Sequence, residues 1–117
     1  MPPLFKDTAR VAAVAEQGAF VTVARVDELP PESVRQVQVG ETEIALAHCN
    51  GGFYAVQGHC IHLQGPLGHG ELEGCVVTCP WHGWQYDVRT GENEFDLAIK
   101  LETYDVQVED GEVRVRI

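Results

Sequence analysis

The sequence predicts an all-β fold of antiparallel strands, and three observations lead to this prediction. Eight segments alternate apolar and polar residues or are rich in β-branched residues, as half-buried strands are. Short turn signals that contain glycine, asparagine or aspartate separate most of these segments. The segments also follow one another without the regular helices of alternating β and α units. A β-sandwich or barrel accounts for all three observations.

The predicted strands account for most of the chain after residue 19. Hairpin turns are expected at Gly40, at Gly51 and at Gly111, because glycine tolerates the left-handed backbone that tight turns need. The strands are predicted at residues 20–26, 34–39, 42–48, 52–56, 75–78, 84–88, 101–108 and 112–117.

A chain of 117 residues is expected to form a single domain, residues 1–117. Residues 1–19 are interpreted as an N-terminal extension. Within it, residues 7–18 place apolar side chains on one helical face, which predicts a short helix that packs on the flank of the barrel or docks a partner. Residues 58–89 are rich in glycine and are expected to form a small loop-built subdomain between strands.

The composition predicts an acidic surface. Eight Lys and Arg residues against 18 Asp and Glu residues give a formal net charge of −10. Such a charge repels nucleic acid and anionic membranes and favours basic patches on protein partners. No stretch is typical of a secretory signal or a membrane span, so a cytoplasmic location is expected. Cysteines there are seldom disulfide-bonded, and Cys49 and Cys75 are therefore predicted to be buried thiols.

Two short motifs hold the candidate site residues. The first is Cys60-Ile-His62 and the second is Cys79-Pro-Trp-His82, so each offers one thiolate and one imidazole. Sixteen residues lie between His62 and Cys79, which is enough for the chain to leave and return so that the two motifs meet. The residues in this pattern are candidate metal ligands.

Two kinds of metal site fit these four donors. A single zinc ion could take all four in a tetrahedral arrangement. A [2Fe–2S] cluster could instead take both thiolates on one iron and both imidazoles on the other. Structural zinc sites usually pair like with like, as two cysteines followed by two histidines. The mixed pairing in each motif therefore favours the iron–sulfur cluster.

The motifs resemble those of the Rieske iron–sulfur proteins, whose signature is C-x-H, a spacer and C-x-x-H. The stretches "PLG" at 66–68 and "CPWHGWQYDVRTGE" at 79–92 are also similar to the loops of Rieske ferredoxins and of oxygenase Rieske domains. The resemblance implies an antiparallel β-sandwich with one [2Fe–2S] cluster per chain at the tip of a small subdomain. The ligands that it implies are Cys60, His62, Cys79 and His82.

The function that the resemblance implies is that of a soluble one-electron carrier. Such a protein would take electrons from a flavin-dependent reductase and pass them to a terminal oxygenase, and we expect a monomer because it must dock twice. The alternative is a Rieske-like small subunit of a nitrite reductase, although such subunits lack the full ligand set. An oxygenase would need a further iron site with two histidines and a carboxylate, but no histidine follows His82.

The residues around the motifs predict a reduction potential at the low end of the Rieske range. High-potential Rieske proteins carry a disulfide between the loops, at the positions that Gly65 and Trp81 hold here, and a serine where this chain has Trp84. Their tyrosine is retained as Tyr86. Fewer hydrogen-bond donors to the sulfurs stabilise the reduced state less. Both tryptophans are expected to shield the cluster, with a docking surface as the alternative for Trp81.

Overall fold

The computed structural model describes residues 19–61, 64–81 and 83–117. Every predicted strand is present within two residues of its expected bounds, whereas the predicted helix at 7–18 lies outside the described residues. The elements are β1 (Phe20–Arg25), η1 (Val26–Glu28), β2 (Ser33–Val39), β3 (Thr42–Cys49), β4 (Gly52–Gln57), η2 (Leu67–His69), β5 (Glu71–Glu73), β6 (Val76–Thr78), β7 (Gln85–Asp87), β8 (Thr103–Glu109) and β9 (Glu112–Arg116).

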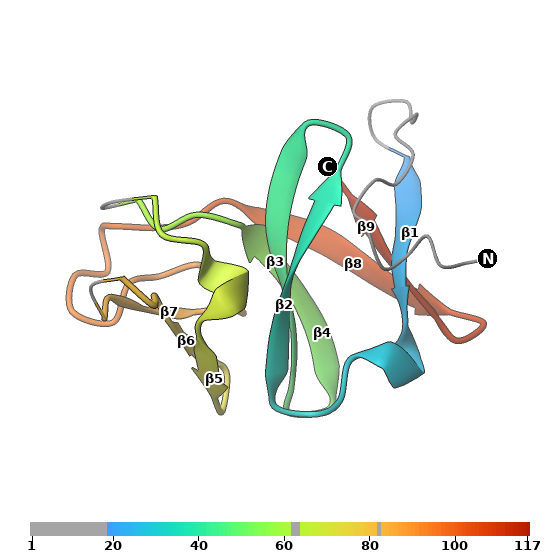
Figure 1. Cartoon of the computed structure of the whole chain (residues 1–117), viewed down its shortest axis with the longest axis horizontal. Helices are drawn as coiled ribbons and strands as arrows, with labels where there is room; N and C mark the ends of the chain where they lie inside the picture. The colour runs from blue at the N-terminus through green and yellow to red at the C-terminus, as the bar shows by residue number, and fades with distance from the viewer. Residues whose placement is uncertain (1–18, 62–63, 82) are drawn as a thin grey trace.

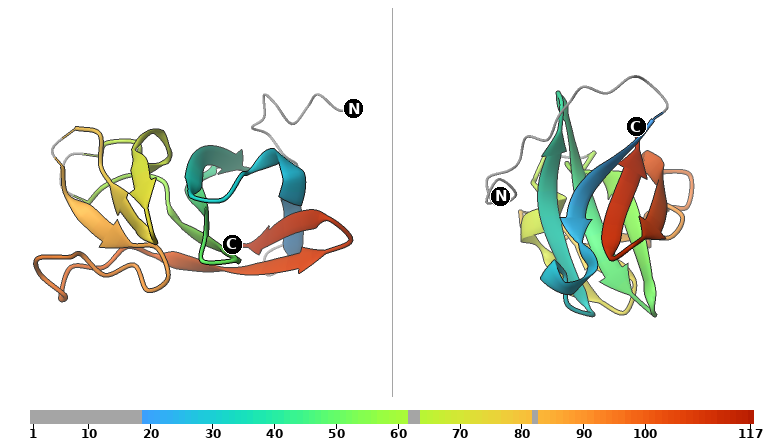
Figure 2. Two further views of the ribbon diagram at one scale, coloured as in Figure 1. Left: turned by 90° about the horizontal axis from the view of Figure 1, so that it is seen from below. Right: turned by 90° about the vertical axis from the view of Figure 1, so that its right-hand side faces the viewer.

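Six strands form one antiparallel sheet in the order β1-β9-β8-β4-β3-β2 (Figure 1). The sheet is so strongly curved that its edge strands β1 and β2 contact each other, which gives a half-barrel (Figure 2). Alternation along the strands fills its interior: in β9 the side chains of Val113 and Val115 are buried, while Arg116 is exposed. The apolar core inside the curve consists of Val23, Ala24, Leu29, Val37, Val39, Ile44, Leu46, Ala55, Val113 and Val115.

Three short strands form a second, smaller sheet in the order β5-β6-β7, at the end of the molecule away from β1 and β9 (Figure 1). The sequence did not predict β5, because three residues are too few for an alternating pattern to be detected. A second apolar core lies under this sheet and contains both cysteines of the motifs, Cys60 and Cys79. The prediction of an all-β antiparallel fold with a small loop-built part is therefore confirmed.

Gln36 of β2 connects the large sheet to the loops that carry the motifs. Its Nε2 donates a hydrogen bond to the carbonyl of Gly58 (2.9 Å), and its Oε1 accepts one from the amide of Gly68 (2.6 Å). Both partners are backbone groups, one at each side of the first motif. One side chain thus binds two buried backbone groups and fixes the loop against β2.

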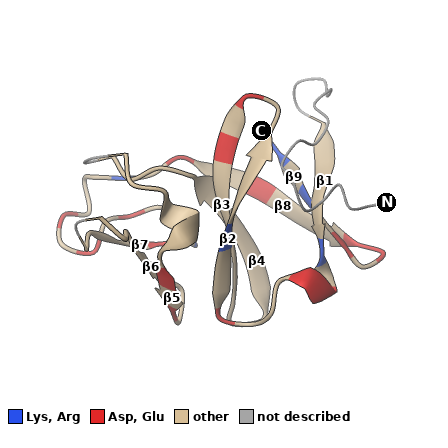
Figure 3. Cartoon of the chain, in the orientation of Figure 1, with Lys and Arg blue, Asp and Glu red and all other residues tan. Residues whose placement is uncertain are grey.

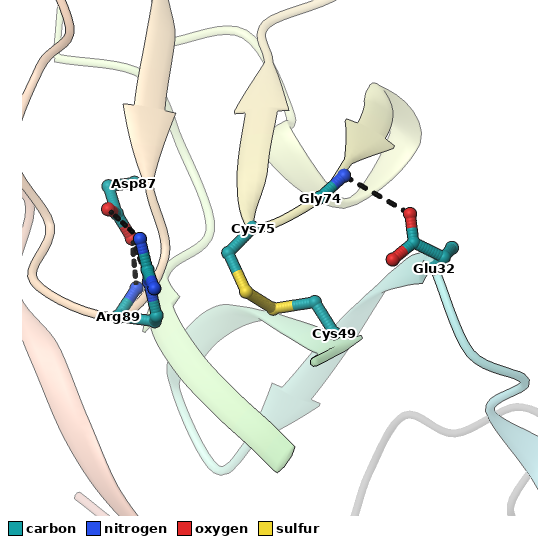
Figure 4. The surroundings of a disulfide bond; sticks show 6 residues. All are labelled: Glu32, Cys49, Gly74, Cys75, Asp87 and Arg89. Atoms are coloured by element: carbon teal, nitrogen blue, oxygen red, sulfur yellow. Dashed lines mark hydrogen bonds and ion pairs between the residues drawn. A yellow bond between two sulfur atoms is a disulfide. The ribbon is translucent and has the colours of Figure 1, made fainter. Parts of the chain in front are cut away.

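The prediction that Cys49 and Cys75 are thiols is wrong, because they form a disulfide (Figure 4). Both residues are buried, as expected. The end of β3 lies beside the start of β6, with the two Cα atoms 5.4 Å apart, a separation that suits a disulfide. A hydrogen bond from the amide of Gly74 to the carboxylate of Glu32 (3.1 Å) crosses the same junction. The small sheet is thus covalently attached to the large one.

Asp and Glu residues are spread over both sheets and the connecting loops (Figure 3). Several of the arginines are paired with them: Arg89 with Asp87, Arg114 with Glu109 and Glu112, and Arg116 with Asp105. In the part of the chain that the structure describes, no helix is long and apolar enough to cross a membrane.

Candidate metal centre

Backbone hydrogen bonds join Cys60 to Gln64 and Gly65 between β4 and η2. The amide of Cys60 donates to the carbonyl of Gly65 (2.8 Å), and the amide of Gln64 donates back to the carbonyl of Cys60 (2.9 Å). Gln64 has a φ of +63°, which side-chain-bearing residues rarely adopt. These two hydrogen bonds hold Cys60 at the base of the loop, where it is only 1% exposed.

Cys79 makes the same pair of hydrogen bonds, to Gly83 and Trp84, between β6 and β7. The amide of Cys79 donates to the carbonyl of Trp84 (2.8 Å), and the amide of Gly83 donates back to the carbonyl of Cys79 (3.1 Å). Gly83 has a φ of +76° and takes the place that Gln64 holds in the first loop. Each cysteine is therefore bonded to the residues four and five positions further along. The two cysteines occupy equivalent places in two matching loops.

The two loops contact each other at Gly65. A Cβ atom at this position would lie 2.6 Å from the Sγ atom of Cys79 and 3.1 Å from the ring of Trp81. Such distances are far below a normal contact between these atoms. The backbone of the first loop can approach the cysteine of the second only because residue 65 has no side chain.

This contact predicts the effect of replacing Gly65 with alanine. The added methyl group must push the two loops apart, so we expect Gly65→Ala to lose most of its iron and sulfide and most of its visible absorbance. The control is Gly74→Ala, which adds the same methyl group with nothing within 4 Å but at a φ of +63°, so it strains the backbone without touching Cys79 and should keep its iron. Wild-type iron content in Gly65→Ala would contradict the close approach described here.

The side chain of Tyr86 in β7 contacts Cys60, the cysteine of the first motif. Its hydroxyl lies 3.2 Å from the Sγ atom of Cys60, within hydrogen-bonding distance, and its side chain is fully buried. Burial raises the pKa of Tyr86 above its ordinary value, and the hydrogen bond and charge of Cys60 raise this pKa further. The phenol therefore keeps its proton at neutral pH and can donate it to a thiolate sulfur.

The structure places two of the four predicted ligands. Cys60 and Cys79 are buried in the same core and remain outside the disulfide. The predicted ligands His62 and His82 lie outside the described residues. His59 lies beside the first motif and pairs with Glu43, Nε2 to Oε1, at 3.0 Å, whereas His69 is exposed on η2.

The two tryptophans do not share one role. Trp84 packs against the core that contains both cysteines and meets the ring of Phe95 edge to face, with centroids 4.9 Å apart. Trp81 is 57% exposed and Ile61 is 41% exposed, one in each loop. Trp84 is therefore packed as expected, whereas the exposure of Trp81 suits the alternative of a docking surface. The loops present apolar side chains to the outside.

Sequence reasoning missed two features of this region. No pattern signalled that Gln64 would take the left-handed place that Gly83 takes in the second loop. It also missed Asn93, the one polar residue that is fully buried among the described residues. An asparagine two residues after Gly91 was the available signal, but it could not show which residue Asn93 faces.

Two buried cysteines in matching loops at one end of an antiparallel β fold suit a β-sheet protein with a metal centre between its loops. The chain belongs to the family of Rieske [2Fe-2S] domains, whose family model matches residues 19–105. Ferredoxin CarAc from Metapseudomonas resinovorans is 32% identical over 98 residues, which cover 82% of this chain and 92% of that protein. A chain in the solved complex of reduced oxygenase and oxidized ferredoxin in carbazole 1,9a-dioxygenase is 30% identical, with a TM-score of 0.77 over 86% of this chain and 94% of the other.

Some relatives are much longer than this chain. Apoptosis-inducing factor 3 from Mus musculus is 34% identical over 96 residues, which are 81% of this chain but only 16% of that protein. The chain spans nearly the whole of ferredoxin CarAc, by contrast. Like the ferredoxin components that it matches along their length, the chain is an electron-transfer protein and not itself a catalytic subunit.

The cofactor of the family is a Rieske-type [2Fe–2S] cluster, and the described residues fit it. The two cysteines that remain as thiols are both buried and equivalently placed. Gly65 has no side chain that would clash with the Sγ atom of Cys79, and the hydroxyl of Tyr86 lies within hydrogen-bonding distance of the Sγ atom of Cys60. A Rieske-type cluster takes two thiolates and two imidazoles from the protein, so the two described cysteines suit its thiolate-bound iron.

Proposed function

We propose that Cys60, His62, Cys79 and His82 hold the cluster. The observation that carries this proposal is the matching hydrogen-bond pattern of the two loops, which puts Cys60 and Cys79 in equivalent places. Each cysteine is followed within three residues by a histidine. With two thiolates and two imidazoles, a [2Fe–2S] cluster takes up and releases one electron at a higher potential than a cluster with four thiolates.

The surroundings of the two cysteines are set by burial and by the hydroxyl of Tyr86. Burial of both cysteines keeps water from their sulfurs, and the Tyr86 hydroxyl lies where it can donate to Cys60. High-potential Rieske proteins have a serine as a further donor, and this chain has Trp84 at that position. We therefore propose a potential at the low end of the Rieske range, and a potentiometric midpoint well above zero would contradict this.

The proposed role is to carry single electrons from a flavin-dependent reductase to a terminal oxygenase. An oxygenase as the electron acceptor is supported by the solved complex of an oxygenase with its ferredoxin, because this chain is similar to a chain of that complex. The exposed side chains of Ile61 and Trp81 beside the two cysteines provide an apolar surface for transient docking. We propose that the chain acts as a monomer in the cytoplasm, as one domain with residues 58–89 as its cluster-binding subdomain.

The test is the absorption spectrum and the EPR spectrum of the dithionite-reduced protein, with iron and sulfide counted on the same sample. Two irons, two sulfides and a rhombic signal of low average g value are the expected result. A colourless, EPR-silent protein that holds one zinc ion would overturn the proposal. An axial or high-g signal would retain the iron but refute the ligand set with two histidines.

The acidic surface predicts a salt dependence of electron transfer. With a formal charge of −10, the protein should be attracted to a basic redox partner, and salt screens that attraction. We expect the second-order rate constant for reduction of a basic c-type cytochrome to fall several-fold between about 20 and 200 mM salt. Stopped-flow absorbance measures this rate, and the midpoint potential serves as the control. A rate that is independent of salt would show that the acidic residues do not steer docking.

A further inference from the structure

Asn93 lies directly opposite Tyr86. The two residues form an antiparallel bridge between β7 and the segment that follows the Thr90-Gly91 turn. Hydrogen bonds flank the pair on both sides, from the amide of Asp87 to the carbonyl of Glu92 (2.9 Å) and from the amide of Glu94 to the carbonyl of Gln85 (2.8 Å). This is the pattern of a non-hydrogen-bonded pair, in which the two side chains share one face and approach most closely.

The amide group of Asn93 is fully buried and only half of it is used. Its Oδ1 accepts hydrogen bonds from the amides of Phe95 (2.9 Å) and Asp96 (3.0 Å). Because both partners are donors, they identify that atom as the oxygen and leave the nitrogen to point elsewhere. The Nδ2 atom is buried without a hydrogen-bond partner among the described residues. A buried amide N–H in this position requires an explanation, since leaving it unsatisfied is unfavourable.

The oxygen of the neighbouring phenol can accept hydrogen bonds as well as donate one. Tyr86 lies 3.2 Å from the Sγ atom of Cys60, and its oxygen has lone pairs as well as one hydrogen. Burial and Cys60 raise the pKa of Tyr86, whereas the backbone of Ile61 and the side chain of Asn93 lower it, as donors that face the phenol oxygen would. A donor on that side of the oxygen leaves the O–H bond to point toward the sulfur.

We propose that Asn93 is a positioning residue for the cluster. Its amide N–H donates a hydrogen bond to the phenol oxygen of Tyr86 and so directs the Tyr86 hydroxyl hydrogen to the sulfur of Cys60. The turn contacts of Oδ1 hold the amide in this orientation. A hydrogen bond to a ligand sulfur stabilises the reduced state and raises the potential. Asn93 therefore raises the potential without contacting the cluster. This inference depends on the proposed function, because it requires Cys60 to be a ligand.

The test is a double-mutant cycle on the purified holoprotein, with the midpoint potential as the readout. Four proteins are titrated potentiometrically: wild type, Asn93→Leu, Tyr86→Phe and the double variant. If Asn93 acts through the phenol, Asn93→Leu lowers the potential when Tyr86 is present and leaves it unchanged in the Tyr86→Phe background. Equal shifts in the two backgrounds, or no shift when Tyr86 is present, would overturn the inference.

A second variant covers the case in which Asn93→Leu does not fold. Asn93→Asp keeps an oxygen for the amides of Phe95 and Asp96 but replaces the donor that faces Tyr86. Any direct effect of the new charge is the same in both backgrounds, so the difference between the two shifts isolates the path through Tyr86. A wild-type protein without a rhombic EPR signal would refute the proposed function. A normal signal with equal shifts would refute only the role of Asn93.

Discussion

Replacing His62 or His82 with alanine should give a protein without the Rieske spectrum. Each imidazole is proposed to occupy one of only two nitrogen positions on the cluster, and alanine offers no donor in its place. We expect loss of the rhombic EPR signal and of most of the iron, measured on protein purified without oxygen. A cluster that is retained with altered g values would mean that another group replaces the lost ligand.

The chain offers two matched controls for this experiment. His59 lies next to Cys60 and pairs with Glu43, and His69 is exposed on η2 seven residues after His62. Neither residue is proposed as a ligand, so His59→Ala and His69→Ala should keep the wild-type spectrum. If His59→Ala or His69→Ala lost the signal and His62→Ala kept it, the proposed ligand set would be wrong.

Replacing both Cys49 and Cys75 with serine should lower stability and leave the cluster in place. The disulfide joins β3 to the small sheet across a sequence separation of 26 residues. Closing a loop of this length in the unfolded chain is worth about 3 kcal/mol in the chain-entropy model. The midpoint of urea denaturation, followed by far-ultraviolet circular dichroism, should therefore fall in the double variant. The visible and EPR spectra should be unchanged.

The single variant Cys75→Ser separates the two roles that Cys75 could have. If Cys75 served as a cluster ligand, this change would bleach the protein, and the assignment of Cys60 and Cys79 would be wrong. If it serves only in the disulfide, the variant should keep its colour and show one additional reactive thiol, from Cys49, after denaturation. An unchanged denaturation midpoint in the double variant would mean that the bond does not constrain the unfolded chain.

Much of the fold could be predicted because its signals are local. Alternation in segments such as 20–26 and 112–117 lies within a few residues of sequence, and the glycines at 40, 51 and 111 mark the hairpins between them. The motifs at 60–62 and 79–82 are equally local, so both the donor chemistry and the family could be read from them. Among the strands, only β5 was missed, because its three residues have no periodic signal of their own.

The features that sequence reasoning missed or predicted wrongly depend on contacts between distant residues. Cys49 and Cys75 are adjacent only because the end of β3 lies beside the start of β6. A prediction based on cellular compartment alone could not reveal that proximity. The exposure of Trp81 likewise depends on how the two loops meet. From sequence alone, a large apolar ring is expected to be packed.

The sequence by itself determined the strand pattern, the acidic charge and the four donors of the two motifs, because each is a property of short segments. The tertiary structure alone decided the disulfide, the contact of Gly65 with Cys79 and the pairing of Asn93 with Tyr86. These three contacts depend on strand register and loop closure. Register sets which side chains face each other across a sheet, and it results from the packing of the whole core.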